Sequence, residues 1–442
     1  MVSARQINRD ILKIAVPNIL GNVTIALLGI VDTWLMGHEG ENSELLIGAI
    51  GLAGIIFNLI YWNFGFLRVA ATGITAQAFG EENQQKQALT FFRALFLGLL
   101  IACIIFLFRN TIGEFGFSLL EKKENIEAIG FAREYFQIRI LAVPAVMMLF
   151  GFRGWFYGMQ NAIYPFILTL VVNIVNIGCS IYFVRVLNWS VAGVAWGTVI
   201  AQYTCLLAAI LLFTRYRWVT KFLNFSSIFI AEQLEGFFKV SGFVFGRNIM
   251  LSAVFTAFTF FSSTVDELYL AANQILIQFF YLMSFAVDGF AYASEALVGK
   301  YTGAKSWQGV KSTIKWTMIW GITFGFLYAL VYTIFGDQLL YQFTPNEDIV
   351  NTGRPFIFWL SIISIIGAVA FIWDGVFIGA TWVWEMFSSM TMATVSFFIV
   401  YFALRKNQPQ HAIWAGMTAY MLIRAVAQWI IYVLKKHRHA SI

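Results

Sequence analysis

Carboxylates are scarce in the long apolar runs of this sequence, and each one is a candidate for chemistry. Five lie inside such runs: Asp32, Asp288, Glu295, Asp374 and Glu385. A charge in apolar surroundings costs several kcal/mol unless it faces water or a partner of opposite charge. Each of these side chains is therefore expected to pair with a cation or to bind and release a proton or a solute.

Asp32 is the strongest candidate. Counted at about 1.5 Å per helical residue, it lies in the outer half of the first predicted helix. A carboxylate there can take up a proton from outside and release it, or exchange it for a cationic solute, when its surroundings change. The alternative is a permanent ion pair with Arg139 that holds helices together. Pro17 frees a backbone carbonyl in the same helix and is a candidate hinge.

Neutral polar side chains lie at a similar depth. Asn173, Asn176 and Ser180 fall on one predicted helix and Thr198 on the next, and with Arg139 they fit one polar layer of a bundle. The two asparagines share a helix face because they are three residues apart. They either line a cavity that binds substrate or make interhelical hydrogen bonds, and the sequence leaves both interpretations open.

The other carboxylates lie nearer the opposite end of their predicted helices. Their candidate partners are Lys300, Arg424 and Arg247. We expect an ion-paired seam there. The alternative is a second ion or gate site formed by Asp374, Asp288, Glu295 and Arg247.

The composition indicates which elements hold these groups. The chain has 442 residues, 60% of them apolar and 12% charged, with a mean hydropathy of +0.74. Soluble domains are about 45–50% apolar and about 25% charged, so soluble, disordered and fibrous classes are excluded. A membrane-spanning helix needs about 20 apolar residues. Twelve spans are predicted, at 11–36, 45–78, 88–108, 131–157, 162–185, 191–214, 236–262, 268–300, 311–335, 353–379, 382–404 and 411–434.

Metal and cofactor chemistry is not expected. The three cysteines form no C-x-x-C pair, and the four histidines lie at span ends or in the tail. The sequence therefore predicts no disulfide framework, no metal site and no cofactor. H-E-x-x-H, G-x-S-x-G and complete P-loop motifs are also absent, which argues against an enzyme.

The basic residues indicate the orientation of the spans. Sixteen Lys and Arg side chains flank one side of the predicted membrane and eight flank the other. By the positive-inside rule both termini are cytoplasmic. The net charge of +6 thus reflects topology, and no nucleic acid partner is expected.

The two halves of the chain resemble each other. A shift of 223 in the numbering pairs Gly80 with Gly303, and a shift of 221 pairs Gly154 with Gly375. Each half holds six spans, so both halves enter the membrane from the same side and the repeat is parallel.

The predicted fold is an all-α polytopic membrane protein with twelve transmembrane helices in two six-helix bundles. Its parts are an N-terminal bundle (1–214), a cytoplasmic linker (215–235) and a C-terminal bundle (236–442). Two bundles that face each other across a cleft are typical of alternating access and not of a channel.

A series of motifs runs along nearly the whole chain. They are DTW at Asp32–Trp34, LRVAATGITAQAFGEEN, FRGWFYGMQNAIYPFI, NIVNIGCS, VAGVAWGTVIAQ and WDGVFIGATWVWEMF. Together they resemble the multidrug and toxic compound extrusion (MATE) family, in particular its DinF-like subgroup. The resemblance implies a proton- or sodium-coupled antiporter that expels organic cations and other amphipathic compounds.

The resemblance also implies roles for single residues. Asp32 matches the first-helix aspartate of the proton site, Asn176 the asparagine hydrogen-bonded around it, and Thr198 a polar position nearby. Ser180 departs from the pattern, because family members often carry an aspartate there.

A second departure concerns helix seven. The NorM-like subgroup has an acidic residue there, whereas 236–262 has none and carries Arg247. Asp374 matches the tenth-helix aspartate of the family. Without an acidic partner from helix seven, a sodium site at Asp374 is weakened.

We therefore predict a secondary active antiporter of the bacterial cytoplasmic membrane. It exports organic cations and amphipathic drugs in exchange for protons, with Asp32 as the coupling carboxylate, and it acts as a monomer in the lipid bilayer. The alternatives are a sodium-coupled exporter of the same family and a lipid or oligosaccharide flippase of the same superfamily. A flippase needs a strongly cationic cleft, whereas only five arginines lie within spans, scattered over both bundles.

Overall fold

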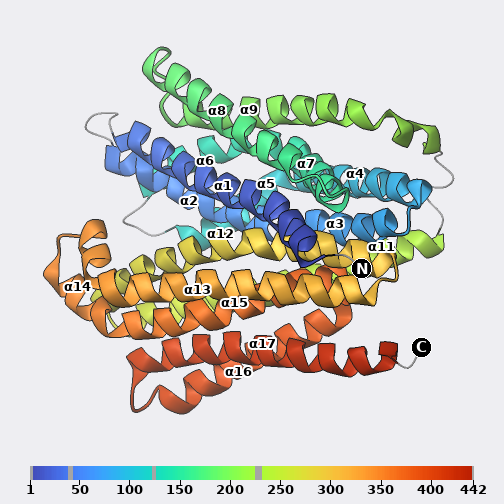
Figure 1. Cartoon of the computed structure of the whole chain (residues 1–442). Helices are drawn as coiled ribbons and strands as arrows, with labels where there is room; N and C mark the ends of the chain where they lie inside the picture. Colours follow the sequence, from blue (N-terminus) through green and yellow to red (C-terminus); the bar gives the residue numbers. More distant parts are fainter. Residues whose placement is uncertain (1–2, 38–42, 122–125, 224–230, 441–442) are drawn as a thin grey trace. The chain divides into compact units, whose positions relative to one another are not determined.

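The computed structural model describes residues 3–37, 43–121, 126–223 and 231–440, and these ranges are almost entirely helical (Figure 1). Within the helices, the side chains of residues 25–30, 32–34, 37, 231–234 and 437–440 lie outside the description. No strand occurs in the described ranges. The predicted all-α class is confirmed.

Eleven helical segments of the described chain are long and apolar enough to cross a membrane. The helix α1 (Ala4–Gly37) supplies the remaining member of the predicted twelve. It is followed by α2 (Ser43–Phe64), α3 (Phe66–Gly80), α4 (Gln84–Leu107), α5 (Arg109–Leu120), α6 (Ile126–Arg139), η3 (Ile140–Ala142), α7 (Val143–Gly158), α8 (Ile163–Arg185), α9 (Ser190–Phe213) and η4 (Thr214–Phe222). The second half contains α11 (Ala231–Ser263), α12 (Glu267–Gly303), α13 (Trp307–Phe343), α14 (Glu347–Gly353), η5 (Arg354–Phe356), α15 (Ile357–Gly379), α16 (Val383–Leu404) and α17 (Pro409–Ala440).

Two predicted continuous helices are broken. The run 45–78 divides at Gly65, which separates α2 from α3. The run 131–157 divides at η3, where Pro144 near the start of α7 cannot donate a backbone hydrogen bond. Glycine and proline both weaken a helix interior. Hydropathy alone does not reveal them, because the segments on either side of each break are apolar.

The described helices pack as two compact units. The first unit is Leu20–Ser241, and the second unit is Met1–Ile19 together with Gly242–Ile442. In the second unit, Trp320 Nε1 donates to Asn8 Oδ1 at 2.9 Å, which fixes the start of α1 against α13. The boundaries expected from the sequence, 1–214 and 236–442, stay a proposal.

The same close helix contact recurs in both units. A Cβ on Gly154 of α7 would lie 2.3 Å from the Arg68 carbonyl oxygen of α3, and a Cβ on Gly375 of α15 would lie 2.2 Å from the Ala291 carbonyl oxygen of α12. The shift of 221 relates the two glycines, and the shift of 223 relates their two partners. These are the two shifts of the sequence repeat. Only glycine lets backbones approach so closely, so the repeat is structural.

Helix ends repeat with the same shifts. Glu82 (φ 55°) follows α3, and its equivalent by the first shift, Lys305 (φ 52°), follows α12. Gln160 (φ 61°) follows α7, and its equivalent by the second shift, Thr381 (φ 55°), follows α15. A left-handed backbone is uncommon for residues other than glycine. Its recurrence at equivalent helix ends therefore supports the internal repeat.

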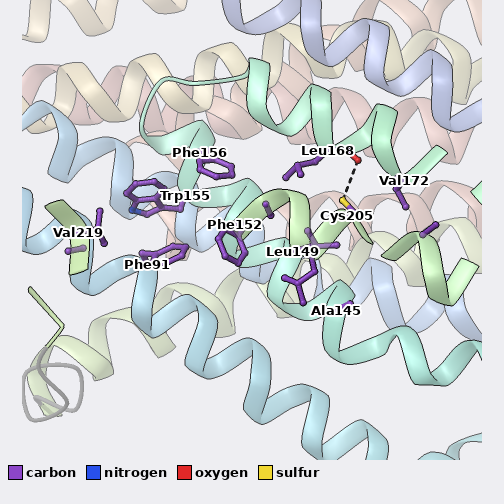
Figure 2. Close-up of a cluster of buried hydrophobic side chains, with 14 residues drawn as sticks. Phe91, Ala145, Leu149, Phe152, Trp155, Phe156, Leu168, Val172, Cys205 and Val219 are labelled. Carbon is purple, nitrogen blue, oxygen red and sulfur yellow. Dashed lines mark hydrogen bonds between the residues drawn. The ribbon is translucent and has the colours of Figure 1, made fainter. Parts of the chain in front are cut away.

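An aromatic core holds the first unit together where α4, α7 and η4 meet (Figure 2). Trp155 and Phe91 are 0% and 2% exposed, and their ring centres are 5.2 Å apart. Trp155 Nε1 donates to the Gln87 carbonyl oxygen at 2.9 Å, so the buried indole is satisfied. Val219 of η4 is buried in the same cluster.

Candidate functional site

The first unit holds a buried row of neutral polar side chains along α8. Asn173, Asn176 and Ser180 are 5%, 1% and 0% exposed, and their spacing places them on one face, which packs against α9. Asn176 Nδ2 donates to Thr198 Oγ1 at 3.0 Å, and that hydroxyl donates to the Val194 carbonyl oxygen at 3.1 Å. The structure thus joins the predicted site residues Asn176 and Thr198 directly.

This polar row is only partly satisfied. Asn173 Nδ2, Asn176 Oδ1 and Ser180 Oγ are buried and have no hydrogen-bond partner in the described part of the chain. A buried donor or acceptor left unpaired costs about 1–3 kcal/mol. A carboxyl group, a water molecule or a solute that bonds to these atoms recovers that free energy.

Asp32 lies on α1, and its side chain is outside the described residues. Helix register still gives its depth. A Cβ on Gly21 of α1 would lie 3.7 Å from Phe166 Cδ2 and 3.9 Å from Thr169 Cγ2 of α8. Asp32 follows Gly21 by eleven residues, and Ser180 follows Thr169 by eleven residues. The first and fifth spans run in the same direction, so helical rise brings the backbone of Asp32 to the level of Ser180.

Ser180 itself lies in a tight helix contact. A Cβ on Gly197 of α9 would lie 2.5 Å from Ser180 Oγ. The hydroxyl occupies the space that the glycine leaves free, and a longer side chain at 180 has little room. Ser180 is therefore a point of close contact between α8 and α9.

Arg139, the alternative partner of Asp32, lies among aromatic rings at the end of α6. Its guanidinium carbon is 4.6 Å from the centre of the Phe57 ring, and Nη1 donates to the Tyr135 hydroxyl at 3.1 Å. A cation over an aromatic face is stabilised by about 0.5–2 kcal/mol. These rings help to fix the Arg139 side chain. The predicted ion pair with Asp32 involves a side chain that lies outside the described residues.

Pro17 lies inside α1, which continues through it from Ala4 to Gly37. The next residue, Asn18, donates its Nδ2 to the Ile14 carbonyl oxygen at 2.7 Å. The division between the two compact units follows Ile19, two residues after the proline. Pro17 is thus at the point where α1 passes from one unit to the other.

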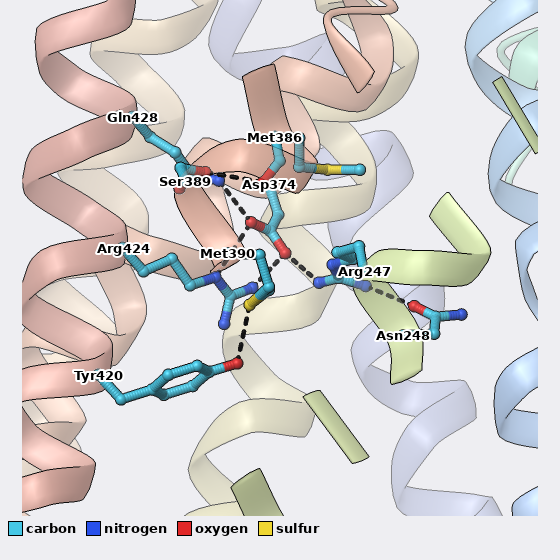
Figure 3. Close-up of polar contacts among 9 residues, drawn as sticks. All are labelled: Arg247, Asn248, Asp374, Met386, Ser389, Met390, Tyr420, Arg424 and Gln428. Carbon is cyan, nitrogen blue, oxygen red and sulfur yellow. Dashed lines mark hydrogen bonds and ion pairs between the residues drawn. The ribbon is translucent and has the colours of Figure 1, made fainter. Parts of the chain in front are cut away.

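The second unit contains a charged cluster that joins three helices (Figure 3). Asp374 of α15 forms ion pairs with Arg247 of α11 and Arg424 of α17 through Oδ2. Its Oδ1 accepts from Arg424 Nε at 3.2 Å and from Gln428 Nε2 at 2.8 Å. Arg247 also donates to Asn248 Oδ1 at 3.0 Å. Because a carboxylate offers about four acceptor sites, Asp374 is saturated.

The cluster is buried as well as saturated. The Arg424 and Asp374 side chains are 0% and 6% exposed, and Arg247 is 14% exposed. Two guanidinium groups beside one carboxylate repel an added cation. Asp374 thus lies in the ion-paired seam expected from the sequence. Gln428 was not predicted, although its spacing of four residues from Arg424 on α17 is a usable signal.

The remaining carboxylates lie around this seam. Asp288 of α12 interacts electrostatically with Arg424. Glu295 is 1% exposed. A Cβ on Gly379 would lie 2.4 Å from the backbone carbonyl oxygen of Glu295. Glu385 forms an ion pair with Lys435. Among the described residues, no group of three or more His, Cys, Asp or Glu side chains could hold a metal ion.

The fold and these two polar sites define a multi-pass helical membrane protein of the transporter class. The family model MatE matches residues 17–181 and, a second time, residues 244–404. The chain belongs to this family, the multidrug and toxic compound extrusion transporters. It is therefore a membrane transporter and not an enzyme.

Named relatives agree with this assignment. The chain is 29% identical over 418 residues to DNA damage-inducible protein F of Escherichia coli strain K12, covering 94% of this chain and 89% of the relative. It is 24% identical over 378 residues to multidrug and toxin extrusion protein 1 of Danio rerio, covering 84% and 62%. The crystal structure of the Vibrio cholerae MATE transporter VcmN in the bent form superposes with a TM-score of 0.85 at 16% identity, covering 99% and 98%. That likeness concerns the fold alone.

Proposed function

We propose that this transporter exports organic cations and amphipathic drugs in exchange for protons, with Asp32 as the coupling carboxylate. The observation that supports this most is the half-satisfied polar row of α8 at the level of Asp32. Neutral amide and hydroxyl groups can bond to a carboxyl group in either protonation state, because they both donate and accept.

The exchange follows from charge balance. A protonated Asp32 is neutral, and a carboxyl O–H can donate to an acceptor such as Asn176 Oδ1, which lacks a partner in the described chain. When the proton leaves, the carboxylate attracts a cationic solute in its place. One group thus holds either a proton or a substrate cation, and alternating access converts that competition into antiport.

The charged cluster of the second unit supports the proposal that proton coupling takes place in the first unit. Asp374 is held by Arg247, Arg424 and Gln428, so a cation that binds there must displace a guanidinium group. This favours protons at Asp32 over a sodium site at Asp374. It also disfavours the flippase alternative, because both arginines are ion-paired with Asp374.

The proposal includes the cellular setting. The excess of Lys and Arg on one side supports an orientation with both termini in the cytoplasm of a bacterial cell. We infer that the chain works as a monomer, because each copy carries both polar sites. Its partners are small organic cations, protons and the lipid bilayer.

Transport in reconstituted vesicles tests the proposal. Efflux of an ethidium-like dye is measured with a pH difference alone and with a sodium gradient alone, for the unmodified chain, for Asp32→Asn and for Asp10→Asn. Asp10 is a matched control because it lies on the same helix and accepts from Gln6 Nε2 at 2.9 Å. We expect transport with the pH difference only, lost in Asp32→Asn and kept in Asp10→Asn. Full transport on the sodium gradient alone would overturn the proposal.

A further inference from the structure

The segment that follows α9 turns its aromatic side chains inward. The 3-10 helix η4 is interrupted at Tyr216, whose backbone is not helical (φ −106°, ψ 40°). The Tyr216 ring centre lies 4.9 Å from that of Trp155, and its hydroxyl accepts from Asn161 Nδ2 at 3.1 Å. Val219 is 0% exposed in the core of Figure 2. These contacts fix η4 firmly to the first unit.

The basic residues of the same segment consequently face outward. Arg215 and Arg217 stand on either side of the inward Tyr216 and are exposed. With Thr214 and the half-buried Trp218 they line a pocket of about 420 Å³. Guanidinium groups bind anions well, because each presents planar paired donors that match phosphate oxygens.

The last turns of α9, which directly precede the pocket residues in the sequence, carry exposed apolar side chains. Leu207, Ile210 and Leu211 are 57%, 46% and 62% exposed, and their spacing places them on neighbouring positions of the last turns of the helix. On a membrane-spanning helix such a surface contacts acyl chains. Basic residues and a tryptophan directly beyond it are typical of the membrane interface.

We propose that this pocket binds the phosphate headgroup of an anionic phospholipid, phosphatidylglycerol, with the acyl chains along Leu207 and Leu211. The charge of Arg215 and Arg217 selects an anion. The adjoining apolar stripe selects a lipid over free phosphate, because it adds apolar contact area that phosphate cannot fill. Lipid bound here fixes η4 at the membrane surface.

Native mass spectrometry of the full chain in neutral detergent tests this site. The protein is titrated separately with phosphatidylglycerol, phosphatidylcholine and inorganic phosphate. Interfacial Lys or Arg side chains contribute about 1 kcal/mol each to anionic lipid binding, so Arg215→Gln/Arg217→Gln should weaken phosphatidylglycerol binding about 30-fold. The matched control, Lys311→Gln/Lys315→Gln, removes the same charge from exposed positions on α13 and should bind as the unmodified chain does.

The outcomes separate the sources of the anion. The proposal is supported if the unmodified chain binds phosphatidylglycerol and Arg215→Gln/Arg217→Gln binds it more weakly. Equal binding of phosphatidylcholine, equal loss in the lysine control, or competition by inorganic phosphate at the same affinity would overturn it. If the double glutamine variant does not fold, the single variants replace it, each with about 5-fold weaker binding. In addition, Arg215→Lys/Arg217→Lys should restore part of the affinity, since it keeps the charge and loses the planar donors.

Discussion

The two units share a fold and differ in what they bury. In both units two helices pack closely at a glycine, which is Gly154 in the first unit and Gly375 in the second. The first unit then buries neutral amides and hydroxyls with free hydrogen-bonding atoms around Asn176. The second buries a carboxylate, Asp374, that two arginines saturate. A repeated scaffold thus carries a row of neutral polar groups in one unit and a charged cluster around an ion-paired carboxylate in the other.

The largest effect is expected at the seam of the second unit. Arg424→Met leaves Asp374 buried beside fewer cations, and breaking a buried pair costs about 3–5 kcal/mol. Thermal unfolding in detergent should show this loss, while Arg405→Met at an exposed position should not. Adding Asp374→Asn to Arg424→Met should recover part of the stability. An Arg424→Met protein as stable as Arg405→Met would mean that the seam does not hold the second unit together.

The shared glycine contacts should respond alike in both units. Gly154→Ala and Gly375→Ala each place a Cβ within 2.3 Å of a carbonyl oxygen, and overpacking costs about 1–3 kcal/mol. Gly130→Ala is the control, because a Cβ there meets nothing within 4 Å. It should gain up to about 1 kcal/mol of helix stability. Opposite responses of Gly154 and Gly375 would break the equivalence of the two units.

At Ser180 the expected result depends on size and charge. Ser180→Asp inserts a larger, charged group beside Gly197 and should lower the unfolding temperature and the yield of folded protein. Ser180→Ala removes an unpaired hydroxyl. It should leave the free energy of unfolding unchanged or raise it by at most about 3 kcal/mol. A Ser180→Asp protein as stable as the unmodified chain would contradict the tight contact of residue 180 with Gly197.

The smallest change in stability is expected in the polar row itself. Asn176→Leu removes the hydrogen bond to Thr198, which is worth about 0.5–1.5 kcal/mol, yet it should reduce pH-driven efflux strongly. Asn248→Leu is the counterpart in the second unit, where it removes a hydrogen bond to Arg247. It should change efflux little. Equal loss of efflux in the two variants would remove the functional distinction between the units.

Much of the architecture could be predicted from the sequence. Apolar runs gave the helices, because the bilayer fixes their length and polarity. The paired glycines indicated the repeat, because close backbone contacts require glycine at equivalent positions of both halves. The break at Gly65 was missed because hydropathy does not register a kink. The helix α5 was missed because it is short, and its burial through Phe117 depends on tertiary contact with Phe136.

The candidate sites were predicted less completely. Residue types identified Asp374, Arg247 and Arg424 as costly in a membrane, and the structure pairs them. The sequence could not show that Gln428 completes the carboxylate or that Gly197 closes over Ser180, because both depend on which faces of two helices meet. The side chain of Asp32 lies outside the described residues, so its role stays a prediction.

Proton release on substrate binding tests the central claim most directly. An organic cation such as tetraphenylphosphonium is added to the purified chain in weakly buffered detergent solution, and the pH change is recorded. The account predicts that the unmodified chain and Asp10→Asn release protons and that a folded Asp32→Asn protein releases none. Proton release by Asp32→Asn equal to that of the unmodified chain would contradict it.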